Sequence, residues 1–356
     1  MRFNYQFPTA AVADYDAWVD GHQLAEVAAA AEDAGFDSFS TTDHPFPPQA
    51  WLERGGHRAF DPFVALSFVA AATTRLKVLT FVLVVGYRNP YLAAKSVASL
   101  DLLSGGRLIV GAAAGYNEAE FAALGADFAH RGEMFDAAVH AMRAAWSGEV
   151  VQHDGPRFPA HGHVMLPRPA QRPCPPLWIG GNSRRAICRA AELGDGWLPF
   201  EQGQRQARIT GSSPLEAVDD LTEKIAELAE LRRQYGRSGP FDVCFTPQGA
   251  APPRGTAPPD GRVPPGSRDL ETYVERFADS VPRYAEAGVS WLTVESRARS
   301  YGDCLAEIKA FARVLSTAGG PAGQDEGPRV TASRPNRSAG RTTTTVAERS
   351  TGEVAR

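Results

Sequence analysis

This chain has few cysteines, a small net charge and no long apolar runs, and each of these features excludes a class of protein. The 4 cysteines among 356 residues lie far apart, so the sequence favours neither a disulfide framework nor a zinc site. No apolar run approaches the length of a membrane span, and the first residues lack the basic and apolar regions of a secretory signal. We therefore expect a cytoplasmic protein with reduced thiols.

The charge balance is nearly even. The formal net charge is −4 at pH 7 and the pI is about 6.1, which gives no field suited to nucleic acid or an anionic membrane. Neither a Gly-x-Ser-x-Gly nucleophile motif nor a Walker phosphate loop occurs. With 43% hydrophobic and 22% charged residues, the composition is that of a globular protein. A small molecule is the expected partner, with no nucleic acid and no membrane.

What the sequence does contain is a regular alternation of strand-like and helix-like segments. Apolar stretches suited to buried strands are each followed by a stretch with helical spacing. The predicted strands are Arg2–Phe7, Ser38–Thr42, Leu76–Val85, Leu108–Ala113, Leu177–Gly180, Gly196–Pro199, Phe241–Thr246 and Val289–Glu295. These eight repeats predict an α/β fold, a closed (β/α)8 TIM barrel over residues 1–318, rather than an open doubly wound sheet.

Four other segments carry their own expectations. The proline-rich stretch Gln152–Pro176 is predicted to form a hairpin over the barrel mouth. Gln248–Ser267, rich in proline and glycine, is predicted to be a loop after the seventh strand. Ser213-Pro214-Leu215-Glu216 has the form of a capping box, which predicts a helix from there to about Tyr235. The polar tail 319–356 has too few apolar residues to fold and is expected to be disordered.

Three polar blocks lie where strands and loops meet. They are Thr41-Thr42-Asp43-His44-Pro45, Tyr87-Arg88-Asn89-Pro90 and Leu103-Ser104-Gly105-Gly106-Arg107-Leu108. We expect all three to face one mouth at the carboxyl ends of the strands, where barrels of this architecture carry their active sites. An imidazole beside a carboxylate can transfer protons near neutral pH, so Asp43 and His44 are the candidate catalytic residues. Turn formation, with Asp43 accepting backbone hydrogen bonds, is the alternative.

Gly180-Gly181-Asn182-Ser183 joins the fifth predicted strand to a helix. Backbone amides and a hydroxyl that converge at a helix N-terminus form a natural phosphate site, and the next two residues are arginines. A purely structural turn is the alternative. Gly111–Gly115 lacks the spacing of a dinucleotide motif, although its small residues would let a flat ligand or the backbone approach. His161 and His163 have no helix-spaced carboxylate, so no metal site is predicted.

Together with Pro176–Ser183, the three polar blocks resemble the bacterial luciferase-like monooxygenase superfamily, in particular its coenzyme F420-dependent branch. The resemblance runs from about Arg2 to Leu315. It implies a barrel that holds a flat redox ring in its mouth, with His44 assisting proton transfer and Asp43 orienting groups around the ring.

The resemblance also implies the cofactor contacts. A non-proline cis peptide is expected near Thr80-Phe81, where it would support the ring. The family's phosphate-binding turn corresponds to Gly180, Gly181, Asn182 and Ser183, and Gly115 and Asn117 complete the implied set.

The implied activity is hydride transfer between F420 and a small organic substrate. One alternative is an FMN-dependent monooxygenase that uses dioxygen and a partner flavin reductase, and another is a non-enzymatic cofactor-binding barrel. The implied partners are a second copy of the chain, because such barrels commonly dimerise through surface helices, and a flavin or F420 reductase. Lysine is rare relative to arginine, a bias typical of the GC-rich genomes whose organisms make F420.

Overall fold

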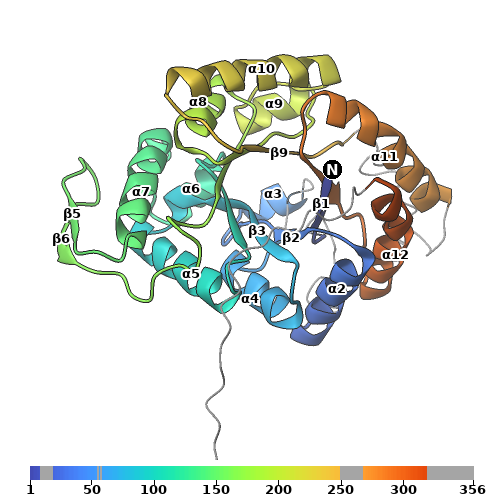
Figure 1. The fold of residues 1–356 in the computed structure, drawn as a ribbon, viewed down its shortest axis with the longest axis horizontal. Coiled ribbons are helices and arrows are strands. Elements are labelled where there is room, and N and C mark those ends of the chain that lie inside the picture. The colour runs from blue at the N-terminus through green and yellow to red at the C-terminus, as the bar shows by residue number, and fades with distance from the viewer. Residues whose placement is uncertain (9–18, 54–55, 57, 249–267, 319–356) are drawn as a thin grey trace, which may run out of the picture. The chain divides into compact units, whose positions relative to one another are not determined.

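The computed structural model describes residues 1–8, 19–53, 56, 58–248 and 268–318 (Figure 1). Within them, eight parallel strands form a closed barrel in the order β1-β10-β9-β8-β7-β4-β3-β2. The strands are β1 (Arg2–Gln6), β2 (Ser38–Thr41), β3 (Lys77–Val84), β4 (Leu108–Ala113), β7 (Leu177–Gly180), β8 (Gly196–Leu198), β9 (Asp242–Phe245) and β10 (Trp291–Glu295). The predicted barrel is confirmed, and each predicted strand end lies within about two residues of the observed one.

Helices surround the barrel on all sides (Figure 1). The long ones are α2 (Gly21–Ala34), α4 (Pro62–Ala72), α5 (Pro90–Leu103), α7 (Arg131–Trp146), α8 (Arg184–Leu193), α10 (Val218–Gln234), α11 (Arg268–Glu286) and α12 (Tyr301–Ala318). Shorter elements are α3 (Gln49–Glu53), α6 (Glu118–Ala123), α9 (Gln204–Thr210) and the 3-10 turn η1 (Val85–Tyr87). No helix in these described ranges is both long and apolar enough to cross a membrane.

Local sequence signals explain several helix ends. The Asn89 side chain accepts a hydrogen bond from Tyr91 N at 2.9 Å, and Pro90 occupies the first turn of α5. Asp20 and Gln23 form a capping box at the start of α2. Gly35, with φ of 96°, ends that helix in the left-handed conformation that glycine adopts at little cost.

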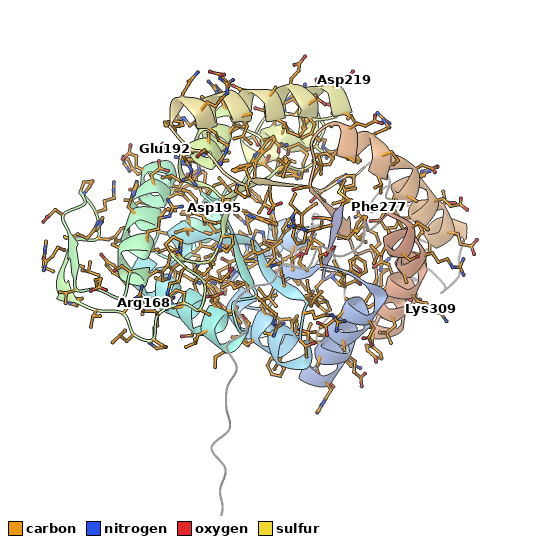
Figure 2. All side chains as sticks on the ribbon, in the orientation of Figure 1. Arg168, Glu192, Asp195, Asp219, Phe277 and Lys309 are labelled. Atoms are coloured by element: carbon orange, nitrogen blue, oxygen red, sulfur yellow. The ribbon has the colours of Figure 1, made fainter. Side chains whose placement is uncertain are left out.

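Apolar side chains fill both the space between barrel and helices and the barrel itself. Between the barrel and the helices lies Phe277 of α11 (labelled in Figure 2). Its ring packs against Phe311 of α12 and Phe3 of β1, with centroid distances of 5.3 and 6.3 Å. Inside the barrel lies a cluster of Leu79, Ile109, Trp178, Leu198, Cys244 and Trp291. The barrel is therefore a packed core whose carboxyl end alone is left to carry a site.

Gly111 of β4 marks a close approach of two strands. A Cβ built on it would lie 2.2 Å from the Thr80 carbonyl oxygen, and Thr80 Oγ1 donates a 2.8 Å hydrogen bond to the Gly111 carbonyl. The prediction that small residues here let the backbone approach is confirmed for Gly111.

The block Leu103–Leu108 lies at the opposite end of the barrel from the one predicted. It precedes β4, and the Arg107 guanidinium donates to the carbonyl oxygens of Ala70 at 2.6 Å and Leu76 at 2.8 Å. These carbonyls lie at the end of α4 and just before β3. Arg107 therefore stabilises the end of a helix and does not face the mouth.

Two further predictions need correction. The stretch Gln152–Pro176 contains an antiparallel hairpin, β5 (Val151–His153) with β6 (Ala160–His163), but it lies outside the barrel beside α7 (Figure 1). Later in the same stretch, the side-chain and backbone amides of Gln171 donate hydrogen bonds of 2.7 and 2.9 Å to Asp101. These bonds hold the stretch against α5, away from the mouth.

The predicted capping box at Ser213 does not begin a helix. Leu215 is buried and pairs with Gln202 through two 2.9 Å backbone hydrogen bonds, so α10 begins later, at Val218. This long-range backbone pairing overrides the local signal. The predicted loop beyond Gln248 and the predicted tail 319–356 lie outside the described residues.

Candidate active site

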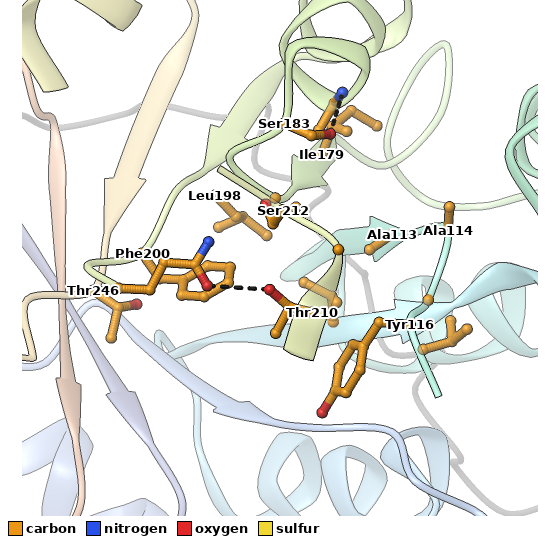
Figure 3. A pocket seen from close by; sticks show the side chains of 18 of the residues that line it. Ala113, Ala114, Tyr116, Ile179, Ser183, Leu198, Phe200, Thr210, Ser212 and Thr246 are labelled. Atoms are coloured by element: carbon orange, nitrogen blue, oxygen red, sulfur yellow. Dashed lines mark hydrogen bonds between the residues drawn. The ribbon is translucent and has the colours of Figure 1, made fainter. Parts of the chain in front are cut away.

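A cavity of about 1210 Å³ opens where the eight strands end (Figure 3). Every barrel strand or the residue next to its end contributes to the wall: Gln6, Thr42, Val84, Ala113, Gly180, Leu198, Thr246 and Glu295. The volume exceeds the roughly 300–1,000 Å³ of a typical small-molecule pocket. It therefore has room for a cofactor and a substrate together.

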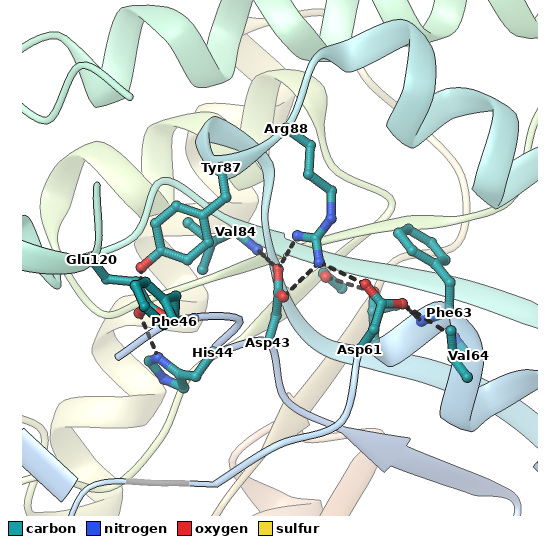
Figure 4. A network of polar contacts seen from close by, with 12 residues as sticks. Asp43, His44, Phe46, Asp61, Phe63, Val64, Val84, Tyr87, Arg88 and Glu120 are labelled. Atoms are coloured by element: carbon teal, nitrogen blue, oxygen red, sulfur yellow. Dashed lines mark hydrogen bonds and ion pairs between the residues drawn. The ribbon is translucent and has the colours of Figure 1, made fainter. Parts of the chain in front are cut away.

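His44 lines this cavity and is held by a buried carboxylate. Its Nδ1 lies 2.9 Å from Glu120 Oε2, and the His44 ring packs at a tilt against Trp51, with centroids 4.6 Å apart. Glu120 lies on α6, the short helix that follows β4, and its side chain is fully buried. The loop after β2 and the helix after β4 thus meet at this pair (Figure 4).

The protonation state of the pair follows from the surroundings of Glu120. Burial alone would raise the pKa of Glu120, but hydrogen bonds from His44, from the Phe46 amide at 3.0 Å and from the Tyr87 hydroxyl at 2.9 Å lower it below its usual value. An ionised carboxylate can only accept, so His44 Nδ1 is the donor. In the neutral imidazole, Nε2 is then the nitrogen that can take up a proton.

Tyr87 supports this arrangement as a neutral donor. Burial, and then the neighbouring Glu120 carboxylate, raises the pKa of Tyr87 far above its usual value. Its hydroxyl therefore keeps its proton and continues to donate to Glu120.

Asp43 also borders the cavity, but its carboxylate is engaged with Arg88 (Figure 4). Arg88 donates to both carboxylate oxygens, at 2.5 and 2.8 Å, and Val84 N donates at 3.0 Å. Arg88 also donates a 3.0 Å hydrogen bond to Asp61, the N-cap residue of α4. Burial alone would lower the pKa of Arg88, but its bonds to Asp43 and Asp61 raise it. These contacts fit the predicted turn-forming role of Asp43 better than a role in proton transfer. A catalytic role for Asp43 stays a prediction.

The end of β3 is irregular beside the cavity. The pairing of β3 with β4 shifts register between Thr80 and Leu83, and a non-proline cis peptide joins Phe81 to Val82. It lies one bond later than the predicted Thr80-Phe81 bond, and Thr80 still pairs regularly with Val110. Phe81 and Val82 line the cavity, whereas Thr80 is buried behind it.

The N-terminus of α8 borders another side of the cavity. Ser183 is the N-cap, and its hydroxyl accepts from Ala186 N at 3.2 Å. The backbone amides of Gly181 and Asn182 already donate to Leu198 O and Ser212 Oγ. The prediction that amides of this turn are free to bind a phosphate is therefore wrong for these two residues. The first-turn amides of Arg184 and Arg185 have no acceptor within the helix, which makes them the donors suited to an anion.

Asn182 and Asn117 lie behind the cavity wall. Asn182 is fully buried and bonds the Phe200 carbonyl at 2.7 Å, so it positions the loop after β8. Asn117 caps α6 and so places Glu120. Gly115, Gly180, Gly181 and Ser183 do line the cavity, and the cofactor contacts of all these residues stay predictions.

Sequence reasoning missed Glu120 and Thr246 and left Arg88 and Glu295 out of the site. A signal for Glu120 was available, because Asn117 caps a helix that starts directly after a barrel strand and so puts the first turn at the mouth. Thr246 and Glu295 follow β9 and end β10, and both line the cavity.

Comparison with known proteins agrees with this geometry. The family model described as luciferase-like monooxygenase matches residues 1–248. An uncharacterized protein of Mycobacterium tuberculosis is 29% identical over 255 residues, which are 68% of this chain and 80% of that protein. A protein of Gordonia bronchialis named F420-dependent glucose-6-phosphate dehydrogenase is 31% identical over 184 residues, which are 50% of this chain and 53% of that protein.

Solved structures share the fold. The monooxygenase RslO1 from Streptomyces bottropensis superposes with a TM-score of 0.69 at 20% identity, over 89% of this chain and 99% of that one. An F420-dependent secondary alcohol dehydrogenase gives a TM-score of 0.63 at 19% identity, over 87% of this chain and 98% of that one. The family model spans more than half of the sequence, and the chain belongs to the luciferase-like monooxygenase family.

Proposed function

We propose that this luciferase-like protein is an F420-dependent oxidoreductase that transfers a hydride between the deazaflavin and a small organic substrate. The observation that carries the proposal is His44, a cavity-wall imidazole whose Nδ1 is held 2.9 Å from the buried Glu120 carboxylate. Hydride transfer to or from an oxygen-bearing carbon needs a proton acceptor or donor beside that oxygen. The His44–Glu120 pair supplies one.

The residues present fit a flat cofactor with a phosphorylated tail. The ring would lie against Phe81, Val82 and Gly115, and Gly115 has a φ of 85° that favours glycine. The tail phosphate would bind at the first turn of α8, with Arg185 and Arg131 nearby on the cavity wall. F420, when bound, supplies a two-electron hydride carrier.

The protein's own contribution is positioning and proton transfer. In alcohol oxidation, His44 Nε2 takes the hydroxyl proton as the carbon loses its hydride and the carbonyl forms. In the reverse direction, the same atom returns the proton to the carbonyl oxygen. Glu120 stabilises the imidazolium in both directions, because its carboxylate remains ionised beside Nδ1.

The relative of Gordonia bronchialis supports F420 over FMN, since its name carries that cofactor. This chain spans about half the length of that relative, so the cofactor choice is our proposal. An FMN-dependent monooxygenase is the alternative that the test must separate.

The test is a pair of activity assays on the purified protein. Loss of the visible absorbance of oxidised F420 is followed with a panel of alcohols, and oxygen consumption is followed with reduced FMN and the same compounds. We expect F420 reduction that depends on an alcohol. Substrate-dependent oxygen consumption with reduced FMN, and none with F420, would overturn the proposal.

A further inference from the structure

We propose that the cavity wall formed by Gln6, Thr246, Gln248 and Glu295 (the polar wall) binds the substrate, and that Thr246 recognises a substrate hydroxyl group. The inference rests on the proposed function, since the opposite side of the cavity is the side assigned above to the cofactor. It names a substrate class: uncharged organic molecules that carry more than one hydroxyl group.

Thr246 carries the argument because its hydroxyl is buried and unused. Its side chain lines the cavity beside Phe200 (Figure 3), and the residue is 3% exposed. Within the part of the chain that the structure describes, Oγ1 has no hydrogen-bond partner. A buried hydroxyl without a hydrogen-bond partner lowers the stability of the fold by about 1–3 kcal/mol. Where such a hydroxyl lies at a cavity wall, a bound ligand can supply the missing hydrogen bond.

The backbone of Thr246 is fully bonded, so the side chain is the group with unused capacity. Its amide donates to Pro199 O at 3.2 Å, and its carbonyl accepts from Glu201 N at 2.9 Å. These bonds fix the residue against the loop after β8. The position of Oγ1 is therefore set by the barrel and not by a mobile surface.

Three other hydroxyls on the cavity wall, those of Ser183, Ser212 and Thr210, are already used within the protein. Ser183 accepts from Ala186 N at 3.2 Å, and Ser212 accepts from Asn182 N at 3.1 Å. Thr210 donates to Gln202 at 3.2 Å, and Gln202 in turn donates to Ser213 O at 2.7 Å. These groups hold the loops around α8 and α9 in place, which distinguishes them from Thr246.

Neighbouring groups on the polar wall extend its hydrogen-bonding surface. Gln6 ends β1 and its side-chain amide makes no hydrogen bond among the described residues, while Gln248 Nε2 lies 3.4 Å from Glu295 Oε2. Amides, a hydroxyl and a carboxylate together bind hydroxyl groups, each of which both donates and accepts. A hydrocarbon would leave the Thr246 hydroxyl and the Gln6 amide unpaired, at a cost in affinity.

The charges of the cavity favour an uncharged substrate at this wall. Glu201 and Arg276 also line the cavity, and Glu295 forms an ion pair with Arg297 at 3.2 Å, so these charges nearly balance and leave no excess of positive charge. By contrast, Arg131, Arg184 and Arg185 lie at the α7 and α8 end. An anionic group would bind at that end and not at the polar wall.

The test compares Thr246→Val, which removes the hydroxyl and keeps the shape, with Thr246→Ser, which keeps the hydroxyl. Thr41→Val is the matched control, because Thr41 Oγ1 is also buried without a partner but lies off the cavity wall. Dissociation constants of trans-cyclohexane-1,2-diol and of cyclohexanol are measured by ligand-observed NMR on the F420-loaded protein. Thermal unfolding and F420 affinity are measured on every variant.

We expect the wild type to bind the diol more tightly than cyclohexanol, and Thr246→Val to weaken diol binding about tenfold. Thr246→Ser and Thr41→Val should stay within about twofold of the wild type. The melting temperature of Thr246→Val should be unchanged or higher, because no hydrogen bond within the protein is lost. A merely structural hydroxyl would instead lower it.

An unchanged diol affinity in Thr246→Val, or no binding of the diol to the wild type, would overturn the inference. F420 affinity separates this failure from failure of the proposed function. A wild type that binds F420 but not the diol contradicts the polar wall alone, whereas a wild type that does not bind F420 contradicts the cofactor.

Discussion

Glu120 Oε2 lies 2.9 Å from Nδ1 of His44, and the carboxylate also accepts from the Phe46 amide and the Tyr87 hydroxyl. Three segments from different strand ends therefore position one imidazole. Burial raises the pKa of Glu120, and the contact with His44 is the largest of the interactions that lower it below its usual value. Glu120 and His44 therefore act as one unit.

Glu120→Gln should reduce turnover strongly and leave the cofactor affinity nearly unchanged. The amide can no longer stabilise a charged imidazolium, so we expect a loss of roughly 10²–10⁴-fold in kcat, similar to the loss in His44→Ala. The measurement is F420 reduction with an active alcohol, across a range of pH. Glu118→Gln, an exposed residue of the same helix turn, is the control. Equal turnover in Glu120→Gln would remove the pair from the chemistry.

Asp43→Asn should act on stability. Asparagine keeps one acceptor oxygen but removes the charge and places an amide donor against the half-buried Arg88 guanidinium, so the two-pronged ion pair is lost. We expect a loss of roughly 2–3 kcal/mol in the free energy of unfolding. Asp61→Asn removes only the exposed end of the same ion-pair chain and keeps a capping acceptor, so it should cost less than about 1 kcal/mol. Denaturant unfolding measures both. Normal stability with lost turnover would instead restore Asp43 as a catalytic residue.

Sequence reasoning located the barrel and His44 because both depend on local patterns. Apolar strands and helix caps repeat along the chain, and residues that follow a strand must lie at its carboxyl end. It missed Glu120 because that residue meets His44 across 76 positions of sequence. The capped helix after β4 indicates that Glu120 lies near the mouth, but a lone glutamate carries no local sign that it is buried against His44.

The block around Arg107 shows a different limit. Its glycines and arginine have the composition of a site loop, but the block precedes β4 and so lies at the amino end of the barrel. Chain direction alone decides this. The helix predicted to start at Ser213 fails for another reason. The capping signal is genuine, but Leu215 gains more from burial and from its backbone pairing with Gln202.

Gly111→Ala should destabilise the barrel severely. The new Cβ would lie 2.2 Å from the Thr80 carbonyl oxygen, a backbone atom that is held in the β3–β4 pairing. We expect a loss of about 3 kcal/mol or more. Gly302→Ala, in α12 with its nearest neighbour 3.9 Å away, should instead gain about 0.5–1 kcal/mol. Thermal unfolding of both variants checks the contrast, and equal melting temperatures would contradict it.

Arg185→Gln should weaken F420 binding by about three- to tenfold. Arg185 lines the cavity at the first turn of α8 and makes no ion pair within the described ranges, whereas Arg184 pairs with Glu227 at 2.5 Å. Arg184→Gln is therefore the comparison, with a smaller expected effect. Titration at two salt concentrations should show that the Arg185 contribution shrinks as salt rises. An unchanged affinity in Arg185→Gln would rule out this arginine as a phosphate ligand.

Glu307→Gln should change how stability depends on pH. Burial raises the pKa of Glu307, although Ser296 and the Arg297 amide donate hydrogen bonds to it. A raised pKa in the folded state means that its favourable contribution is complete below the unfolded pKa of about 4.3 and is lost as pH rises through the folded pKa. Relative to the wild type, the glutamine variant should gain stability as pH increases from about 4.5. Parallel stability curves would contradict this.

Equilibrium titration of the purified protein with F420 and, separately, with FMN tests the proposed F420 site. Quenching of tryptophan fluorescence reports both ligands under the same conditions. We expect F420 to bind at micromolar concentration and FMN to bind much more weakly, with the F420 affinity reduced in Arg185→Gln. Tighter binding of FMN than of F420 would rule out F420 as the cofactor.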